Sequence, residues 1–565
     1  MRFHLSRRTL GYGFFLIAAA AVATFSAYTE IRPIAHVIVA SAFLMVFLIC
    51  RTLFLGIVTS SLFAAGTIFL IYGASKFKFW LTARRLHPYD LYLYFNLDNL
   101  RYARILFPGQ YLLLYAGIAA VIISFAVLVW VEGLHRPSKM VFAGFLAVVA
   151  TLVTVQQVGK YGEYGVLGGG NRFMHFDHQH VSTFLISAAQ SLPELLAGKA
   201  FDYGSDIALS PERIEEAKKP ACTTVADAPD LYVVMRESAM IPASRPEMEA
   251  PQVGPERFRS SNGKTYRLRV ETHGAGSAHT IFSVLTGLSA ESFGEMKNIG
   301  IDLSTGRIKM AVPQMLKDCG YRTLAITTGI DGYVMEEAFY KSIGFDEYYD
   351  YNDTIAFSNG DDSDRAVYAF ARSITAKMDG SRPLLVYIDT TATHGPYSYK
   401  KWPEREVPDA AAVSPEASEY LRRLLAGEQD FQDYIADLGA RVTAGGHRAL
   451  ITDFGDHHPS FTKYLPGRSG LVDESRQADD DLLITYFRMT SLGFSLPALP
   501  DHSLVDAAFV GDWLLRASGL PVQGIYGLRW AMVEKCASRY WRCDNEAPAH
   551  ELHQTLRAAG LITIP

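Results

Sequence analysis

Apolar positions are unevenly distributed along the chain, and nearly all of the long apolar runs lie before residue 160. Five runs approach the ~20 residues that a helix needs to cross a ~30 Å hydrocarbon core. They cover residues 10–28, 33–50, 52–73, 109–131 and 140–157. The pattern predicts an N-terminal polytopic α-helical membrane domain of about five spans over residues 1–157. A cleaved signal peptide is the alternative for the first run, although no clear small-residue cleavage site follows it.

An odd number of spans places the two chain ends on opposite sides of the membrane. The basic residues at the N-terminus favour an inside position, and those after the second and fourth runs fall on the same side: Arg2, Arg7, Arg8, Arg51, Arg136 and Lys139. We therefore expect a multi-pass protein of the bacterial cell (inner) membrane, in contact with the lipid bilayer, whose C-terminal part is periplasmic or extracellular. Residues 76–107 are basic and aromatic on that outer side, so either they are interfacial or the topology is miscounted.

A connector with an interfacial helix is expected over residues 158–228. It begins with a glycine-rich stretch, continues through an amphipathic stretch and ends in the polar segment SPERIEEAKKP. Its HFDHQH cluster contains His175, His178 and His180. Metal binding and an interfacial location are both open for these histidines.

From about residue 229 the pattern changes to short apolar strands that alternate with helices. Strands are predicted at 231–235, 266–270, 322–327, 384–389, 449–452 and 482–487, with helices between them, for example at 312–320 and 418–442. This alternation indicates an α/β domain over residues 229–565, with a central sheet covered by helices on both faces.

Charge and cysteine content narrow the picture further. The formal net charge is −5 and no basic tract is present, so no nucleic-acid partner is expected. Cys222, Cys319, Cys536 and Cys543 lie in the soluble part, and an even number outside the cytoplasm permits disulfides. Cys536 and Cys543 are close in sequence and are the predicted bridge. Four free thiols are the alternative.

Polar side chains follow several predicted strands, and ligand sites in α/β sheets collect at the carboxyl ends of strands. Together these strand ends supply carboxylates, imidazoles and one hydroxyl, which suit a divalent cation and an activated nucleophile. The residues concerned are Glu237, His273, Ser277, His394, Asp453, Asp456, His457 and His458.

The stretch ETHGAGSAHTIFSVLTGL, residues 271–288, predicts a helix that begins at Ser277. Free N–H groups and the positive end of the helix dipole favour an anion at that position. Gly274 and Gly276 allow the backbone to approach closely. A serine hydroxyl is unreactive by itself, but a bound cation can hold it as an alkoxide. An ordinary helix N-cap is the alternative for Ser277.

Several ordered motifs resemble the alkaline phosphatase/sulfatase superfamily. Ser277 and Thr286-Gly287 have the spacing of the sulfatase signature, in which Thr-Gly follows a Cys or Ser nucleophile by nine and ten positions. VVMRESA resembles the first strand of the phosphoethanolamine transferases. FGDHHPSF, THGPY and residues 320–350 are similar to segments of the lipoteichoic-acid-synthase-like phosphoglycerol transferases.

This resemblance implies an alkaline-phosphatase-like fold with a central mixed sheet, in the membrane-bound phosphotransferase branch. It implies one divalent metal ion, zinc or manganese, bound by Glu237, Ser277, Asp456 and His457, with Ser277 as nucleophile. It also implies that His394 contacts the transferred or leaving group. The expected donor is a membrane phospholipid carrying phosphoglycerol or phosphoethanolamine, and the acceptor is a glycan or glycolipid.

The chain also departs from these families. The transferases usually have Thr as nucleophile, and the sulfatases have Pro and then Ser-Arg after it, whereas Ser277 is followed by Ala-His-Thr-Ile. Phosphoglycerol transferases have Trp and Arg after the Asp that corresponds to Asp331, and this chain has Gly-Tyr. A sulfatase or phosphodiesterase-type hydrolase and, more remotely, an inactive binding protein are therefore the alternatives.

Other roles remain open for individual residues. Asp331, His273 and His458 are candidate substrate-binding residues alongside His394. His273 could instead be a turn residue, Asp453 could simply close a strand, and His458 could support a metal ligand from behind.

Overall fold

The computed structural model divides the chain into two units, Met1–Ala197 and Gly198–Pro565, and each is described by itself. The domain boundaries predicted at residues 157 and 228 stay predictions. The described residues are 7–30, 33–82, 86–88, 119, 123–134, 139, 141–144, 146, 180–185, 187–188, 200–222, 227–245, 248, 253–329, 337–378, 380–407, 412–465, 480–521 and 523–565.

Within the described residues of the N-terminal unit, three helices are long and apolar enough to cross a membrane. They are α1 (Arg7–Thr29), α2 (Pro33–Thr52) and α3 (Ile57–Thr82), and they correspond to the first three predicted spans. Residues 76–82 of the segment predicted as interfacial belong to α3. The fourth predicted span is represented by the apolar helix Ile123–Glu132. The rest of it and most of the fifth lie outside the described residues.

Two hydrogen-bonded side chains of this unit, Glu132 and His180, bear on the sequence predictions. The Glu132 carboxylate accepts the backbone N–H groups of Val58 and Thr59 at 2.9 and 2.7 Å, and so satisfies free donors at the start of α3. His180 is buried, and its Nδ1 lies 2.8 Å from Ser75 Oγ. Its predicted partners, His175 and His178, lie outside the described residues.

The C-terminal unit is built on one mixed sheet of eight described strands, in the order β4-β3-β5-β1-β6-β7-β2-β8. Strands β4, β3, β5, β1 and β6 are mutually parallel, and β7 runs antiparallel to both of its neighbours. The bounds are β1 Asp230–Arg236, β2 Tyr266–Arg269, β3 Arg322–Ile326, β4 Glu347–Tyr349, β5 Leu384–Thr390, β6 Ala449–Gly455, β7 Ile484–Leu492 and β8 Leu504–Asp506. All six predicted strands are therefore confirmed, while the short strands β4 and β8 were missed.

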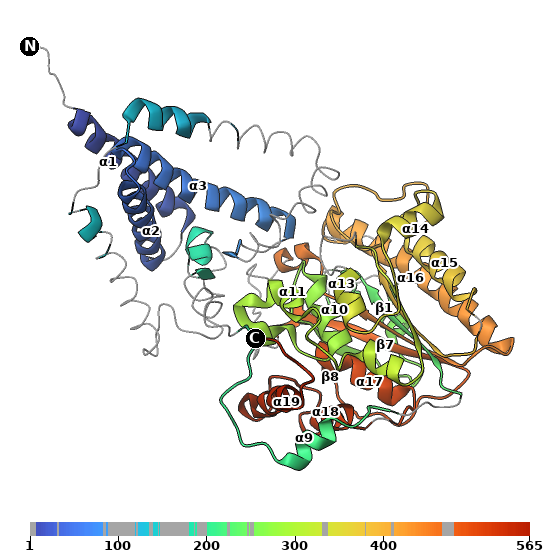
Figure 1. Cartoon of the computed structure of the whole chain (residues 1–565). Coiled ribbons are helices and arrows are strands. Elements are labelled where there is room, and N and C mark those ends of the chain that lie inside the picture. The colour runs from blue at the N-terminus through green and yellow to red at the C-terminus, as the bar shows by residue number, and fades with distance from the viewer. Residues whose placement is uncertain are drawn as a thin grey trace, which may run out of the picture. The chain divides into compact units, whose positions relative to one another are not determined.

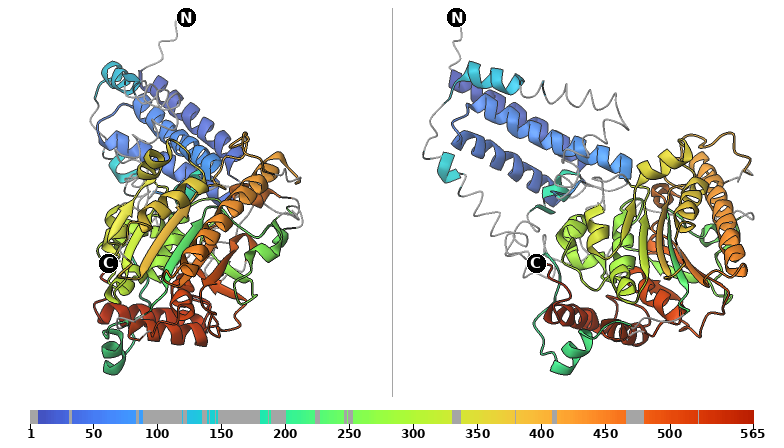
Figure 2. Two further views of the ribbon diagram at one scale, coloured as in Figure 1. Left: turned by 90° about the vertical axis from the view of Figure 1, so that its right-hand side faces the viewer. Right: turned by 45° about the vertical axis from the view of Figure 1, so that its right-hand side comes forward.

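Strands β1, β5 and β6 are buried along their whole length, as expected for parallel strands covered on both faces. Helices α15 (Asp364–Thr375) and α16 (Pro415–Thr443) pack an apolar core against one face, whereas α10 (Ser277–Thr286), α12 (Val312–Asp318) and α17 (Val510–Ala517) belong to the other layer (Figures 1 and 2). The remaining helices are α9 Pro211–Ala217, α11 Gly300–Ser304, α13 Glu337–Ser342, α14 Tyr351–Ser358, α18 Ile525–Lys535 and α19 Ala547–Ala558.

Two disulfides occur in this unit. The predicted Cys536–Cys543 bridge is confirmed, and Cys222 pairs with Cys319 across a separation of 97 residues. Closing so long a loop restricts the unfolded chain, which raises the free energy of unfolding.

Helix α10 is bounded by glycines at both ends. It begins at Ser277 after Gly276, whose φ is +87°, and ends at Gly287, whose φ is +70° and whose N–H bonds Ser283 O at 2.9 Å. A left-handed glycine is a common helix C-cap because it has no Cβ to strain. The Gly287 carbonyl also accepts from Arg529, which is buried and paired with Asp512.

We expect Gly287→Ala to lower the free energy of unfolding by about 1–3 kcal/mol more than Gly306→Ala does. Gly306 has nearly the same φ, +73°, but open space around it, whereas a Cβ on Gly287 would collide with the fixed Arg529 guanidinium. The difference between the two variants therefore isolates the collision from the backbone strain. Chemical unfolding of the full chain in detergent, followed by tryptophan fluorescence, measures it, and equal losses would contradict the expectation.

Candidate active site

The site begins where two neighbouring strands end. Strands β1 and β6 are parallel, and their register places Arg236 opposite Gly455. Glu237 follows β1 directly, and Asp456 and His457 follow β6. Because parallel strands end at the same edge of a sheet, the side chains that follow them meet there.

The structure brings together the four residues predicted to bind the metal. Ligand atoms of Glu237, Asp456 and His457 all lie within 4.8 Å of one another, and the three side chains are buried. His457 Nε2 lies 3.3 Å from Asp456 Oδ2 and 3.6 Å from Glu237 Oε1. Ser277 Oγ donates to Glu237 Oε2 at 3.0 Å and lies 3.4 Å from His457 Nε2. The hydroxyl and the three ligands thus share one site.

The two buried carboxylates, Glu237 and Asp456, repel each other electrostatically. Burial raises the pKa of Asp456 to about 7, and the nearby charge of Glu237 acts in the same direction. Burial also works against the ionised form of Glu237. The charges of His457 and His394 and the hydrogen bonds from Ser238 and Ser277 nevertheless hold its pKa below the usual value. A cation between the two carboxylates would remove this conflict.

The donor set fits a divalent metal ion. Among the described residues, the buried Asp456 Oδ2 accepts no hydrogen bond and lies 3.3 Å from His457 Nε2, which is costly unless a ligand uses this oxygen. His457 Nδ1 lies 2.9 Å from the His458 carbonyl, so Nδ1 carries the proton and Nε2 faces the carboxylates with a lone pair. Two carboxylates, one imidazole and one hydroxyl suit zinc or manganese, and ligand softness does not choose between them.

Ser238 links both carboxylates, a role that the sequence pattern did not reveal. Its φ is +51°, a strained value for a serine. In this conformation its N–H donates to Asp456 Oδ1 at 2.7 Å and its Oγ donates to Glu237 Oε1 at 2.8 Å. Tyr420 fixes the turn by donating its hydroxyl to the Ser238 carbonyl at 2.9 Å. The strained turn therefore orients both carboxylates toward the site.

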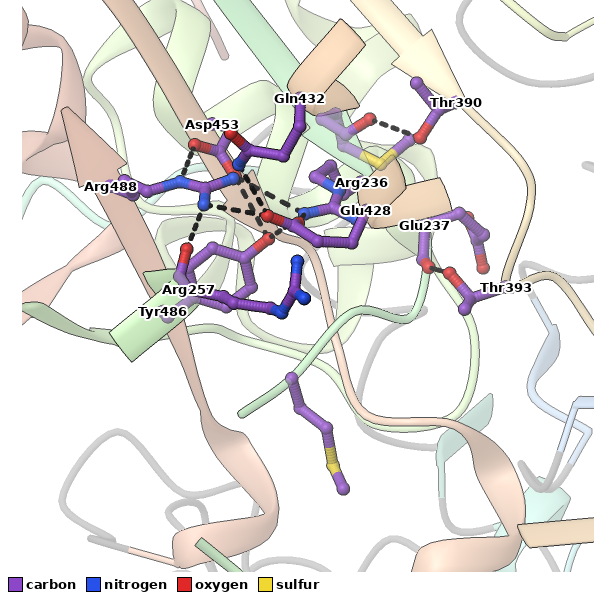
Figure 3. A network of polar contacts seen from close by, with 12 residues as sticks. Arg236, Glu237, Arg257, Thr390, Thr393, Glu428, Gln432, Asp453, Tyr486 and Arg488 are labelled. Atoms are coloured by element: carbon purple, nitrogen blue, oxygen red, sulfur yellow. Dashed lines mark hydrogen bonds and ion pairs between the residues drawn. The ribbon is translucent and has the colours of Figure 1, made fainter. Parts of the chain in front are cut away.

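A buried ion network supports the two strands just before the site (Figure 3). Arg236 pairs with Glu428, and Arg488 donates to Asp453 at 2.8 and 2.9 Å and to Glu428 at 3.1 Å. The Tyr486 hydroxyl donates to Asp453 at 3.1 Å. Burial would raise the pKa of Glu428, but the two guanidiniums lower it to about 2. Asp453 therefore serves as a counterion within the sheet.

His394 lies at the next strand end. It follows β5 in the THGPY segment, is exposed, and its Nδ1 lies 2.6 Å from the Gly395 carbonyl. The preceding Thr393 donates its hydroxyl to the Glu237 carbonyl, which joins this segment to the end of β1 (Figure 3). His394 is therefore accessible to solvent, and its Nδ1 rather than its Nε2 faces the Gly395 carbonyl.

The other candidate substrate residues have different surroundings. His458 is fully buried, its Nε2 lies 2.9 Å from the Ile484 carbonyl, and burial lowers its pKa to about 3. His273 is also buried, and its Nε2 lies 3.0 Å from Thr462 Oγ1. Asp331 lies outside the described residues. Of these histidines, only His394 is exposed.

The N-terminal end of helix α10 lies at the site. Among the described residues, no side chain caps it, so Ser277 is the first helical residue rather than an N-cap. Thr280 donates its hydroxyl to the Asp456 carbonyl at 2.7 Å, which attaches the first turn to the end of β6. The N-terminal end of the helix, with the positive end of its dipole, suits the oxygens of a phosphoryl or sulfuryl group.

Comparisons with known proteins agree with this geometry. A family model described as Sulfatase matches residues 237–484. A putative cyclic beta-1,2-glucan modification protein of Rhizobium meliloti is 22% identical over 345 residues, which are 58% of this chain and 52% of the relative. The chain spans about half the length of the curated relatives it matches.

Two solved structures are also similar to this chain. The lipooligosaccharide phosphoethanolamine transferase A of Neisseria meningitidis matches with a TM-score of 0.48 and 11% identity, over 90% of this chain and 92% of that chain. A phosphoglycerol transferase of Streptococcus pyogenes, in complex with sn-glycerol-1-phosphate, matches with a TM-score of 0.47 and 15% identity, over 62% and 89%.

The family match begins at Glu237 and includes Ser277, His394, Asp456 and His457, so the residues brought together by the fold lie inside it. Residues 237–484 therefore match the sulfatase family model, in agreement with the resemblance seen in the sequence.

Proposed function

We propose that this protein transfers the phosphoglycerol or phosphoethanolamine headgroup of a membrane phospholipid, through a covalent Ser277 intermediate, to a periplasmic or cell-surface glycan or glycolipid. The observation that carries the proposal is the convergence of the Ser277 hydroxyl with Glu237, Asp456 and His457 at an uncapped helix start. A hydroxyl beside a metal site and an anion-binding helix end is the arrangement that attack on phosphorus requires.

Glu237, Ser277, Asp456 and His457 would hold a divalent cation, which would lower the pKa of the serine hydroxyl and neutralise charge on the phosphoryl oxygens. Ser277 Oγ attacks phosphorus, forming an Oγ–P bond as the bond to the diacylglycerol oxygen breaks. The serine proton passes to Glu237 Oε2, to which it is already hydrogen-bonded at 3.0 Å. His394 protonates the leaving oxygen.

The second step reverses these roles. An acceptor hydroxyl gives its proton to His394 and attacks phosphorus, and the Oγ–P bond breaks, so that Ser277 recovers its proton. His394 is exposed, so it can exchange a proton with substrate in both steps. His458 is less suited to this role, because it is buried and its Nε2 lies at hydrogen-bond distance from the Ile484 carbonyl.

Two further observations support a transferase over a formylglycine-type sulfatase. The position of the sulfatase arginine is taken by Ile281, which is buried. The apolar helices α1, α2 and α3 would anchor the chain in a membrane, which is where a phospholipid donor is found. The name of the Rhizobium relative favours a glucan as acceptor. We place the catalytic unit outside the bacterial inner membrane, in the periplasm or at the cell surface.

Replacing the nucleophile tests the proposal directly. We expect Ser277→Ala to reduce transfer of label from headgroup-labelled phospholipid by about 1,000-fold or more, because no other hydroxyl replaces the attacking oxygen. Ser277→Thr, which keeps a hydroxyl, is expected to retain measurable transfer. Full-length protein in lipid vesicles with a glycan acceptor provides the assay.

Mass spectrometry of the same protein without acceptor should show an adduct on the peptide that contains Ser277. The mass of this adduct identifies the donor headgroup. Undiminished transfer by Ser277→Ala would overturn the proposal. Equal release of headgroup to water with and without acceptor would identify a hydrolase instead.

Metal affinity is expected to depend on pH through Asp456. With its pKa raised to about 7, Asp456 holds a proton in the metal-free protein at lower pH, and a cation must displace that proton. The apparent dissociation constant for Zn²⁺ or Mn²⁺ should therefore rise about tenfold for each pH unit below about 7. Calorimetric titration of the metal-free protein across that range measures it.

Asp318→Asn serves as the control, because Asp318 is an exposed carboxylate on α12 away from the site, and it should leave the pH profile unchanged. Asp456→Asn should abolish tight binding at every pH. An affinity that stays constant between pH 5.5 and 7 would contradict the assignment.

A further inference from the structure

A pocket lies at the start of α15. It has a volume of about 330 Å³ and is lined by residues that include Asp361, Ser363, Arg365, Trp402, Arg405 and Glu406, and we call it the Trp402 pocket. Ligand pockets have volumes of about 300–1,000 Å³, so this one suits a small unit. None of the sequence predictions placed a function there.

The topology places the Trp402 pocket at the same edge of the sheet as Ser277. Helix α15 leads into β5, so its first residues lie near the carboxyl ends of the parallel strands. Contacts confirm this, because the Asp364 carboxylate accepts the N–H groups of Thr391 and Ala392 at 3.0 and 2.8 Å. These residues stand just before His394.

The loop from His394 to Trp402 is fixed to α16. The buried Arg423 donates to the carbonyls of His394, Pro396 and Tyr399 at 2.7, 3.0 and 3.0 Å. The Glu419 carboxylate accepts the N–H of Lys401 at 2.8 Å. The pocket is therefore preorganised with respect to the proposed proton-transfer residue.

Trp402 is held in a strained conformation. Its φ is +50°, a genuine outlier for a bulky side chain, and such strain of about 1–3 kcal/mol is concentrated at functional sites. Its Nε1 donates to Asp362 Oδ1 at 2.9 Å, and the Lys401 ammonium lies 4.4 Å from the ring centroid. These contacts fix a partly buried indole at the pocket wall.

Carboxylates outnumber guanidiniums among the residues that line the pocket. Asp361, Glu404 and Glu406 contribute carboxylates. Of the two guanidiniums, Arg405 is already paired with Asp430 at 2.6 and 2.7 Å. Carboxylates accept hydrogen bonds and repel anions, so neutral groups with many hydroxyls are favoured over phosphates or uronates.

An indole at a pocket wall that also carries carboxylate acceptors matches a sugar ring, which has apolar C–H faces and peripheral hydroxyls. We propose that the Trp402 pocket binds a neutral sugar unit of the acceptor, adjacent to the unit whose hydroxyl receives the headgroup. The role as acceptor subsite rests on the proposed function, whereas sugar binding itself does not.

Direct binding tests the proposal without turnover. Full-length Ser277→Ala protein in detergent is titrated with a neutral glucose disaccharide and, separately, with a uronic-acid disaccharide, and saturation-transfer NMR reports binding. We expect the neutral sugar to bind and the uronate to bind at least about tenfold more weakly. Adding Trp402→Ala should weaken binding of the neutral sugar by about tenfold or more, and Trp402→Phe should weaken it less because an aromatic face remains.

Trp530→Ala is the matched control. Trp530 is likewise partly buried and donates its Nε1 to a carboxylate, that of Glu534, at 2.9 Å, but it lies on α18 away from the Trp402 pocket. It should leave sugar binding unchanged. Glu406→Gln, at an exposed position with little effect on folding, should weaken binding a few-fold by removing an acceptor.

Each result decides one question. Sugar binding that is unaffected by Trp402→Ala, equally reduced by Trp530→Ala, or stronger for the uronate overturns the pocket assignment. If binding depends on Trp402 but no Ser277 adduct forms from phospholipid, the proposed function fails and the carbohydrate site stands. If the adduct forms but binding does not depend on Trp402, the function stands and the pocket proposal fails.

Discussion

The close approach of two buried carboxylates is the constraint on which the site depends. Strands β1 and β6 are hydrogen-bonded in parallel, so Glu237 and Asp456 leave the sheet side by side. Neither carboxylate can move away, because the strained Ser238 turn donates to both. A proton on one of them or a cation between them resolves the repulsion. The register of β1 and β6 therefore creates an acidic edge of the sheet that suits a metal ion.

The ion network beneath this edge explains how such a charge density is tolerated. Arg236 and Arg488 carry two positive charges into the sheet, where Glu428 and Asp453 neutralise them. Truncating one member would leave an uncompensated buried charge, which is far more costly than the pair is stabilising. Arg236 directly precedes Glu237, so fixing the arginine also fixes the start of the turn that carries Glu237.

Helix α16 connects the chemistry to the Trp402 pocket. Its middle supplies Glu428 to the ion network, and its first half supplies Glu419 and Arg423 to the loop that carries His394 and Trp402. One rigid helix thus holds the sheet, the proposed proton-transfer residue and the pocket in register. A sugar seated on Trp402 would therefore meet the covalent intermediate in a geometry fixed before binding, which lowers the entropic cost of the second step.

The sequence by itself determined the apolar helices, the central strands and the start of α10, because these follow from local hydrophobic periodicity and glycine positions. It also pointed to Glu237, Ser277, Asp456 and His457, since strand ends and ordered family motifs can be read along the chain. Only the tertiary structure decided that Ser238 orients both carboxylates, that Asp453 is a counterion, that His458 is buried, and that Trp402 lines a pocket near His394. Those roles depend on neighbours more than 25 residues away or on a backbone angle, and hydrophobic periodicity records neither.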